Sequence, residues 1–358
     1  KEVSARLSQY KAFAIRFRVP QDNIILDDMI KGEINFDNNI IGDFVILRSD
    51  GFPTYNFAVV VDDAEMKMTH IIRGDEHLSN TPRQIMLYKA LGFPVPKFGH
   101  LAMILGEDKA KLSKRHGATS LSFYKEKGYL PEAILNYLAL LGWTPENAQE
   151  IMGLQEISNN FNLNRVSKSP SVFDVKKLDW FNSQYIKKYD LDSLLDLVIP
   201  YWDLAGIDGK YLFDKANRGT LKEILAAVQD SITRLSDIPD ETFFFFGNDI
   251  NNHDKSCKKW LEDANAEPVL SYFIRTFSSD DNVNFSEEWI QSRLKTVISD
   301  LGIGTRKVMM PIRSVLTGRT KGPELYIIMK ILGKERVIQR AKSGLQYVRR
   351  NQDVATHL

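Results

Sequence analysis

A short cationic segment carries the strongest chemical signal in the sequence. Its residues are Lys111, Leu112, Ser113, Lys114 and Arg115, with Gly106 and Gly117 on either side. Two ammonium groups, a hydroxyl and a guanidinium on one loop are donors that suit phosphate oxygens, and the glycines would let the loop move. Such loops are also common on solvated surfaces, and no Gly-x-x-x-x-Gly-Lys sequence precedes this one, so it is not a Walker loop. The segment predicts a phosphate contact without specifying the reaction.

A single guanidinium is the best candidate for binding a carboxylate. Arg73 ends the segment 69–73, which is typical of a short buried strand, and Gly74 follows it. Arginine can hold a carboxylate through two parallel hydrogen bonds, and open α/β sheets bind their ligands where strands end. An ion pair of Arg73 with Asp75 or Glu76 is the structural alternative, and both interpretations can hold together.

Strands and one well-delimited helix must position these groups. We expect strands over residues 13–19, 40–47, 55–61 and 69–73, the last of them buried. A helix follows, in which Thr81 can act as the N-cap and Gln84 can complete a capping box, while Gly92 ends it. This order of strand, loop and helix is half of a parallel α/β unit, whose sheet needs more strands than precede it here.

The pattern becomes helical from about residue 122 onward. Apolar residues recur every three to four positions over residues 131–141, 191–199, 220–235, 255–277 and 287–301. An aromatic run at 243–246 is more typical of a core than of a ligand site. The sequence therefore predicts an incomplete α/β portion followed by a mostly helical one.

The composition is that of a folded protein rather than a disordered or fibrous one. The chain has 358 residues, of which 43% are hydrophobic and 26% charged, and this length predicts two or three domains. No stretch approaches the roughly 20 apolar residues that cross a bilayer, so we expect no membrane association. The single cysteine, Cys257, cannot form an internal disulfide, which favours a reducing, cytoplasmic compartment.

Charge is distributed unevenly along the chain, although the net charge is only +1. From Arg306 to the end there are 12 basic and 3 acidic residues. This asymmetry can direct a polyanion to one end of a molecule. A solvated basic helical face is the simpler explanation if charge is considered alone.

Taken together, these motifs resemble the glutamyl-tRNA synthetases, which are class I aminoacyl-tRNA synthetases. Segment 111–115 is similar to their "KMSKS" signature loop. Residues 49–63 are similar to the strand of their glutamate pocket. Residues 69–78 and 81–84 are similar to the strand and the helix that follow it. Their stem-contact and anticodon-binding parts are similar to residues 173–182 and 310–318. The resemblance covers essentially the whole chain in the right order.

The resemblance implies a fold of the α/β plus all-α class. Residues 1–120 would form the remainder of a connective insertion and the C-terminal part of a Rossmann-like catalytic domain. Residues 121–195 would form a helical stem-contact region, and residues 196–358 an α-helical anticodon-binding domain. Glutaminyl-tRNA synthetases read the anticodon with β-barrels, so the helical pattern favours the bacterial glutamyl type.

The resemblance also implies a two-step reaction with L-glutamate, ATP and its Mg²⁺, and tRNA(Glu), carried out by a monomer. Glutamate attacks the α-phosphate of ATP, and the terminal adenosine of the tRNA then takes the glutamyl group. Such chemistry needs positive charge where the oxyanion develops rather than a covalent nucleophile on the enzyme. The catalytic cations would be Lys114 and Lys111.

The same resemblance assigns the binding residues. ATP would be bound by Glu76, His77, Ile104, Lys111, Leu112, Ser113, Lys114 and Arg115. Glutamate would be bound by Tyr55, Asn56, Val59 and Arg73. The tRNA would be bound by Arg306, Lys307, Arg313 and Arg319. Charge reversal of Arg313 and Arg319 should weaken tRNA binding and flatten its dependence on salt.

One signature of class I catalysis is missing. The chain has six histidines and no two of them stand three apart, so no His-Ile-Gly-His motif is present. We therefore expect the chain to be the C-terminal three-quarters of a synthetase. Zinc, which some members bind through Cys-x-Cys spacing, is not expected with one cysteine.

Two alternatives stay open from the sequence. The chain as it stands can be a tRNA-binding fragment without catalysis, since one wall of the ATP site is missing. The chain can also belong to a relative that charges tRNA with glutamine. A relative that lacks the anticodon-binding region is disfavoured by the long helical part after the signature loop.

Overall fold

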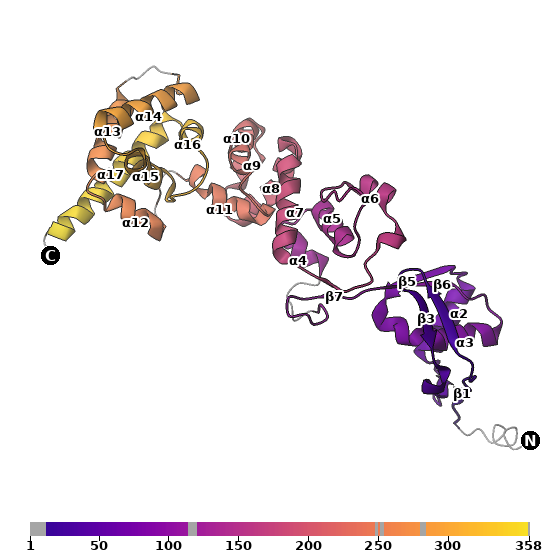
Figure 1. Ribbon diagram of the computed structural model, residues 1–358. Coiled ribbons are helices and arrows are strands. Elements are labelled where there is room, and N and C mark those ends of the chain that lie inside the picture. The colour runs from indigo at the N-terminus through magenta and orange to yellow at the C-terminus, as the bar shows by residue number, and fades with distance from the viewer. Residues whose placement is uncertain (1–11, 114–119, 248–249, 251–253, 280–283, 357–358) are drawn as a thin grey trace, which may run out of the picture. The chain divides into compact units, whose positions relative to one another are not determined.

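The computed structural model describes residues 12–113, 120–247, 250, 254–279 and 284–356 (Figure 1). The chain divides into two compact units. The first consists of Lys1–Thr119 and Leu135–Val175, and the second of Ser120–Ile134 and Lys176–Leu358.

Paired short strands form the frame of the first unit. Antiparallel pairs join β1 (Ile15–Phe17) to β4 (Phe44–Leu47) and β2 (Ile24–Asp28) to β3 (Gly32–Phe36). Parallel pairs join β5 (His70–Gly74) to β6 (Lys97–Leu101) and β7 (Ile104–Leu105) to β8 (Ser171–Val172). A hydrogen bond from the Met29 N–H to the Phe98 carbonyl, 2.8 Å long, ties the end of β2 to β6.

The parallel pair depends on α3 (Thr81–Leu91), which forms the crossover between β5 and β6. Gly92 ends α3 in the left-handed conformation, with a φ of 72°. The buried face of α3 includes Ile85 and Tyr88, and it packs beside α2 (Tyr55–Glu65) near β5 and β6 (Figure 1). The prediction of half a parallel α/β unit is confirmed, and the register places Arg73 of β5 opposite His100 of β6.

The predicted strand at 55–61 is wrong, because these residues form the start of α2. Val60 is fully buried, and Phe57 and Ala64 pack against the same cluster at spacings of three and four residues. This helical stripe decides the conformation, since the preference of β-branched residues for strands is weak and yields to packing. Thr54 precedes the helix and donates its hydroxyl to the Val45 carbonyl over 2.9 Å.

Three other local predictions need correction. The strand expected at 40–47 is shortened to β4, because a 3-10 turn occupies Asn38–Ile40. β5 forms where expected but is not buried: Ile72 is 48% exposed, since among the described residues β5 pairs only with β6. Thr81 lies within the first turn of α3 instead of capping it, and Asn80 takes the N-cap position.

Helices complete both units. The first unit contains α6 (Leu154–Asn160), and α5 (Pro131–Gly142) passes from the second unit into the first. The second unit contains α4 (Leu121–Glu126), α7 (Val175–Lys188), α8 (Leu191–Leu204), α9 (Gly209–Phe213), α10 (Arg218–Val228) and α11 (Ile238–Thr242). It continues with α12 (Lys255–Leu261), α13 (Ala266–Ser278), α14 (Glu287–Leu301), α15 (Thr305–Thr317), α16 (Leu325–Leu332) and α17 (Lys334–Thr356).

The helical part agrees with the predicted class and differs at several boundaries. The helix expected at 191–199 continues to Leu204. The helix expected at 255–277 is divided into α12 and α13, because Asp263 accepts the Asn265 N–H at 2.9 Å in a local turn. α10 ends at Val228 rather than at residue 235. Phe244 and Phe245 of the aromatic run are buried, as predicted, in a continuous apolar core. The fold class, an α/β portion followed by a helical one, is confirmed.

A close helix contact in the second unit leads to a stability prediction. A Cβ atom added at Gly344 of α17 would collide with the side chain of Val315 of α15, whereas one added at Gly219 of α10 would meet nothing within 4 Å. We expect Gly344→Ala to lower the free energy of unfolding by about 1–3 kcal/mol through overpacking. Gly219→Ala should instead be neutral or stabilise by up to about 1 kcal/mol. Urea denaturation of both variants checks this, and equal effects would contradict the close contact.

Candidate functional site

Arg73 is the centre of a hydrogen-bonded cluster in the first unit. It lies near the carboxyl end of β5, and its Nε–H donates to His100 Nε2 at 3.2 Å. Its Nη2 donates to Thr81 Oγ1 and to Gln84 Oε1, both at 2.8 Å. The guanidinium also lies over the ring of Phe98, 5.4 Å from the centroid. Its orientation is therefore set by β6 and by the first turn of α3.

Burial lowers the pKa of the Arg73 guanidinium, although the negative charge of Asp63 opposes this effect. Arginine nevertheless stays charged at any physiological pH. Within the described part of the chain Nη1 has no hydrogen-bond acceptor, while Nε and Nη2 are engaged. The cluster thus holds a fixed positive charge with one nitrogen available to a ligand. A carboxylate would meet this single nitrogen rather than the two-nitrogen fork that the sequence predicts.

The alternative prediction for Arg73, an ion pair with a neighbour, is wrong. Asp75 pairs with Lys31 at 2.9 Å, and Glu76 pairs with Lys111 at 2.8 Å. Both carboxylates are therefore neutralised by other cations. The positive charge of Arg73 is not cancelled by either of them.

A buried pair of titratable residues supports the cluster from the other side. Asp28 Oδ2 lies 2.6 Å from His100 Nδ1, and Asp28 and His100 are 2% and 0% exposed. Burial raises the pKa of Asp28, but hydrogen bonds from the Lys31 N–H, the His100 ring and the Ile30 N–H outweigh it and lower the pKa. Burial lowers the pKa of His100, and the hydrogen bond that Nε2 accepts from Arg73 requires the neutral ring.

The predicted glutamate-binding residues of α2 lie close to this cluster. Asn56 Oδ1 accepts a hydrogen bond of 3.0 Å from Gln84 Nε2, so the Gln84 amide links Asn56 to Arg73. Tyr55, at the start of α2, is 55% exposed, and its ring centroid is 6.1 Å from that of His77. Val59 is partly buried on the same helix.

The predicted ATP-binding residues lie on two segments that meet. Glu76 and His77 belong to a 3-10 turn, Asp75–Asn80, directly after β5. Lys111 comes from the signature loop, and its ion pair with Glu76 joins the loop to this turn. The pair lowers the pKa of Glu76 through the Lys111 hydrogen bond. Both side chains are well exposed, so the pair is weak and the ammonium can exchange to another anion.

Backbone hydrogen bonds shape the signature loop before residue 114. Leu112 N–H donates to the Ile104 carbonyl at 3.0 Å, and Gly106 N–H donates to the Ala110 carbonyl at 2.9 Å. The predicted residues Ile104, Leu112 and Ser113 are therefore on one tight hairpin that begins with β7. Lys114 and Arg115 lie outside the described residues, so the distance from Lys114 to Arg73 stays untested.

The predicted tRNA-binding residues have different environments in the second unit. Arg306 and Lys307 are exposed on the first turn of α15, and Arg306 lies over the Trp260 ring at 5.3 Å. Arg319 is 3.3 Å from Glu241 and stacks over Phe243 at 5.2 Å. Arg313 is partly buried: its Nη1 is enclosed and has no hydrogen-bond partner among the described residues, and burial lowers its pKa.

Four polar residues of the site were not predicted as functional: Asp28, Thr81, Gln84 and His100. Thr81 and Gln84 do not form the expected capping box, because their side chains bind Arg73 instead. Asp28 and His100 are 72 positions apart in the sequence. One signal could have indicated Asp28. Buried and exposed residues alternate along the strand 24–28, and Asp28 is a polar residue at a buried position of that pattern.

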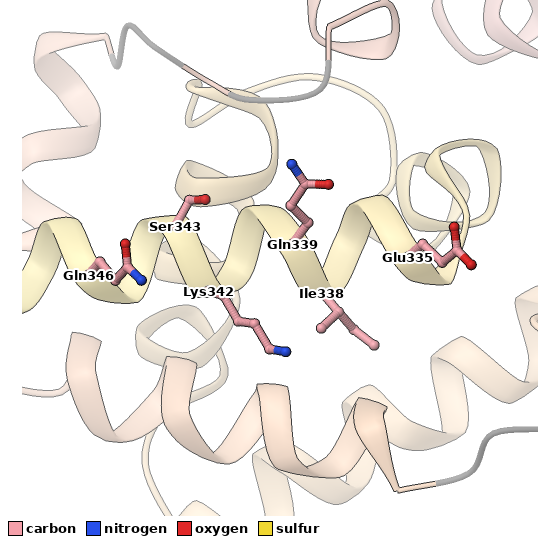
Figure 2. A pocket seen from close by; sticks show the side chains of 6 residues that line it. All are labelled: Glu335, Ile338, Gln339, Lys342, Ser343 and Gln346. Carbon is pink, nitrogen blue, oxygen red and sulfur yellow. The ribbon is translucent and has the colours of Figure 1, made fainter.

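One surface depression, on α17, does not join this site. The depression is lined by Glu335, Ile338, Gln339, Lys342, Ser343 and Gln346, all from one helix (Figure 2). None of the predicted site residues lines it. Among the described residues there is no group of three or more His, Cys, Asp or Glu that could hold a metal ion. Within that same part of the chain, no helix is long and apolar enough to span a bilayer.

Comparisons with known proteins agree with this geometry. Residues 1–180 match the family model "tRNA synthetases class I (E and Q), catalytic domain", and residues 193–345 match "Anticodon binding domain". The glutamate–tRNA ligase of Carboxydothermus hydrogenoformans is 42% identical over 331 residues, which are 91% of this chain and 68% of that protein. The Heliobacterium modesticaldum glutamate–tRNA ligase is 43% identical, covering 93% and 66%.

A solved structure shows the same similarity in three dimensions. It is a glutamate–tRNA ligase from Elizabethkingia meningosepticum in complex with its amino acid, with a TM-score of 0.86 and 32% sequence identity. The alignment covers 97% of this chain and 71% of that one. The chain therefore matches about two thirds to three quarters of the length of these relatives.

Proposed function

Because the chain belongs to the glutamate–tRNA ligase family of class I aminoacyl-tRNA synthetases, we propose that its residues serve the two steps of that reaction. ATP activates L-glutamate to glutamyl-adenylate, and the glutamyl group is then transferred to the 3′ end of tRNA(Glu) for translation in the cytoplasm. The observation that supports this most directly is the oriented positive charge of Arg73 at the end of β5, which forms no ion pair with the neighbouring Asp75 or Glu76. Tyr55, Asn56 and Val59 would complete the amino-acid side of the site.

The proposed first step needs no nucleophile from the protein. The α-carboxylate oxygen of glutamate forms a bond to the α-phosphorus of ATP, and the bond to the bridging oxygen of pyrophosphate breaks. Lys111, Ser113, Lys114 and Arg115 would donate to the phosphates, where negative charge accumulates. ATP would bring Mg²⁺ on its phosphates, and zinc is not expected in a chain with a single cysteine. Lys111 would leave Glu76 for the phosphates, since an exposed ion pair is worth only about 0–1 kcal/mol.

We also propose that these 358 residues do not form the adenylate unaided, because they contain no His-Ile-Gly-His motif. A purified chain should therefore show no glutamate-dependent exchange of pyrophosphate into ATP above background, while it retains affinity for tRNA(Glu). Exchange is measured with radiolabelled pyrophosphate, and tRNA binding by filter retention. Robust exchange would contradict the inactivity, and equal retention of tRNA(Glu) and an unrelated tRNA would contradict the assignment of the RNA.

The choice between glutamate and glutamine rests on the charge of Arg73. A cation with an available N–H prefers the side-chain carboxylate of glutamate to the neutral side-chain amide of glutamine, because the hydrogen bond to the charged group is about twice as strong. We expect calorimetric titration to show tighter binding of L-glutamate than of L-glutamine. The reverse order would favour the relative that charges tRNA with glutamine.

The anticodon-binding function is proposed for the basic part of the second unit, with Arg306, Lys307, Arg313 and Arg319 as contacts. We expect the double variant Arg306→Glu/Lys307→Glu to bind tRNA(Glu) more weakly. Its log–log salt slope should flatten by roughly 1.5, since each phosphate contact contributes about 0.7–0.9.

A control variant separates the effect of where the charge is changed from the effect of how much the net charge changes. Lys210→Glu/Lys215→Glu makes the same change in net charge on exposed residues outside the basic segment. It should leave the salt slope nearly unchanged. Equal slopes for the two double variants would discard the proposed contact. Arg313 is less suitable for this test because its partly buried guanidinium also affects folding.

A further inference from the structure

Asp28 and His100 form a buried hydrogen-bonded pair that the proposed chemistry does not use. The two side chains come from β2 and β6, and each is almost completely removed from solvent. Burying polar and charged groups is costly unless their hydrogen bonds are satisfied, so such a pair is expected to have a role. Among the described residues, the pair reaches the ligand-binding side through His100 Nε2, which contacts the Arg73 guanidinium and the Thr81 hydroxyl.

The hydrogen bonds determine which nitrogen of His100 carries the proton. Arg73 Nε is always a donor, so His100 Nε2, 3.2 Å away, must accept. The proton of the neutral ring is then on Nδ1, from which it is donated to Asp28 Oδ2 at 2.6 Å. The Thr81 hydroxyl accepts from Arg73 and has one proton to donate, either to His100 Nε2 at 3.0 Å or to the His77 carbonyl at 3.3 Å, so it is compatible with an accepting Nε2.

Asp28 is itself held in place by the backbone. Its Oδ1 accepts N–H groups from Ile30 at 3.0 Å, Lys31 at 2.9 Å and His100 at 3.2 Å. Only an oxygen can occupy this position, since three donors point to it. The second oxygen, Oδ2, is therefore fixed toward the imidazole, and Asp28 selects the tautomer of His100.

We propose that Asp28 and His100 are positioning residues for glutamate recognition: Asp28 keeps the His100 proton on Nδ1, and Nε2 then fixes Arg73 so that its Nη1 is presented to the substrate carboxylate. This inference rests on the proposed function for the identity of the ligand. The hydrogen-bond arrangement itself does not depend on it. Neither residue touches the reacting atoms.

The arrangement has a defined dependence on pH. The charged groups that face His100 are Asp28 from β2, Arg73 from β5 and Lys31 from the turn after β2. Burial, Arg73 and Lys31 lower the pKa of the ring below its ordinary value of 6.5, and Asp28 opposes them. Protonation of Nε2 would place two donors face to face and release Arg73. Glutamate affinity should therefore be constant above pH 6.5 and fall as the pH drops through the lower pKa of the folded protein.

Three substitutions in the full chain separate positioning from mere packing. In Asp28→Asn the amide oxygen must replace Oδ1, so the NH₂ group faces His100 Nδ1 and forces the proton to Nε2. In His100→Gln the amide oxygen can take the place of Nε2 and still accept from Arg73. In His100→Asn the shorter side chain reaches Asp28 but not Arg73. The matched control is Asp27→Asn, because Asp27 is exposed on the same strand.

The first measurement is nitrogen-15 NMR of the histidine rings, with the His100 signals assigned by their loss in His100→Gln. The second is calorimetric binding of a sulfamoyl analogue of glutamyl-adenylate, and thermal unfolding verifies that each variant is folded. We expect the Nδ1–H tautomer in the unmodified chain and the Nε2–H tautomer in Asp28→Asn. Affinity should fall about 10–100-fold in Asp28→Asn and His100→Asn. It should stay within about threefold in His100→Gln and Asp27→Asn.

Specific outcomes would overturn the proposal. They are an Nε2–H tautomer in the unmodified chain, unchanged affinity in Asp28→Asn, or equal affinities in His100→Asn and His100→Gln. If the unmodified chain does not bind the analogue, the proposed function fails, and the positioning role fails with it. If it binds and folded Asp28→Asn binds equally well, only the positioning role is wrong.

Discussion

Arg73→Lys is expected to lower the affinity of the chain for L-glutamate by about 100-fold, equivalent to about 2.7 kcal/mol. The ammonium keeps the positive charge but cannot reproduce the planar set of donors that bind His100, Thr81 and Gln84. Truncating one partner of a buried, hydrogen-bonded charge pair typically costs about 2–5 kcal/mol. Calorimetric titration with L-glutamate measures the change.

Arg83→Lys is the matched control for this substitution. Arg83 is on the same helix, where it donates to the Ser79 carbonyl at 2.9 Å and lies over Phe44, outside the cluster. It should bind glutamate as the unmodified chain does. Equal affinities of the two variants would show that Arg73 does not contact the substrate.

Arg340→Met is expected to lower the free energy of unfolding of the second unit by about 3–5 kcal/mol. Arg340 is 1% exposed, and its guanidinium donates to the carbonyls of Leu316 at 2.6 Å, Phe244 at 2.7 Å and Gly247. Methionine fills much of the volume but leaves these carbonyls without that donor, and each unsatisfied buried group costs about 1–3 kcal/mol.

Arg349→Met tests whether this effect is specific to the buried position. Arg349 is also on α17, but it is exposed and pairs with Glu267 at 2.9 Å, an interaction worth about 0–1 kcal/mol. Urea denaturation followed by tryptophan fluorescence compares the two variants. A loss below about 1 kcal/mol for Arg340→Met would mean that other donors replace the guanidinium.

Local signals explain which elements the sequence predicts well. The helix Thr81–Leu91 ends at Gly92 and α14 ends at Gly302, both with positive φ, so their C-terminal boundaries are encoded by single residues. The segment 55–61 is mispredicted because its three valines favour a strand only weakly, and the core spacing of Phe57, Val60 and Ala64 is helical.

Local sequence signals also explain why part of the site is predicted. Arg73 follows a recognisable strand, and Lys111 belongs to a contiguous motif. The support from Asp28 and His100 depends on the packing of β2 beside β6, which no local spacing records. Likewise, the sequence treats Arg306 and Arg313 alike, whereas tertiary packing exposes one and encloses the other.

The parallel alignment of β5 with β6 has a consequence for how this site can vary between homologues. Arg73 and His100 are partners in that alignment, and a shift of one residue would turn every side chain of the strand to the opposite face. Deletions and insertions should therefore accumulate in the connection at 92–96 and be excluded from the strands themselves. Among homologues, the recognition site should therefore end where insertions and deletions begin to be tolerated. The tolerance to amino-acid substitution should not mark this boundary.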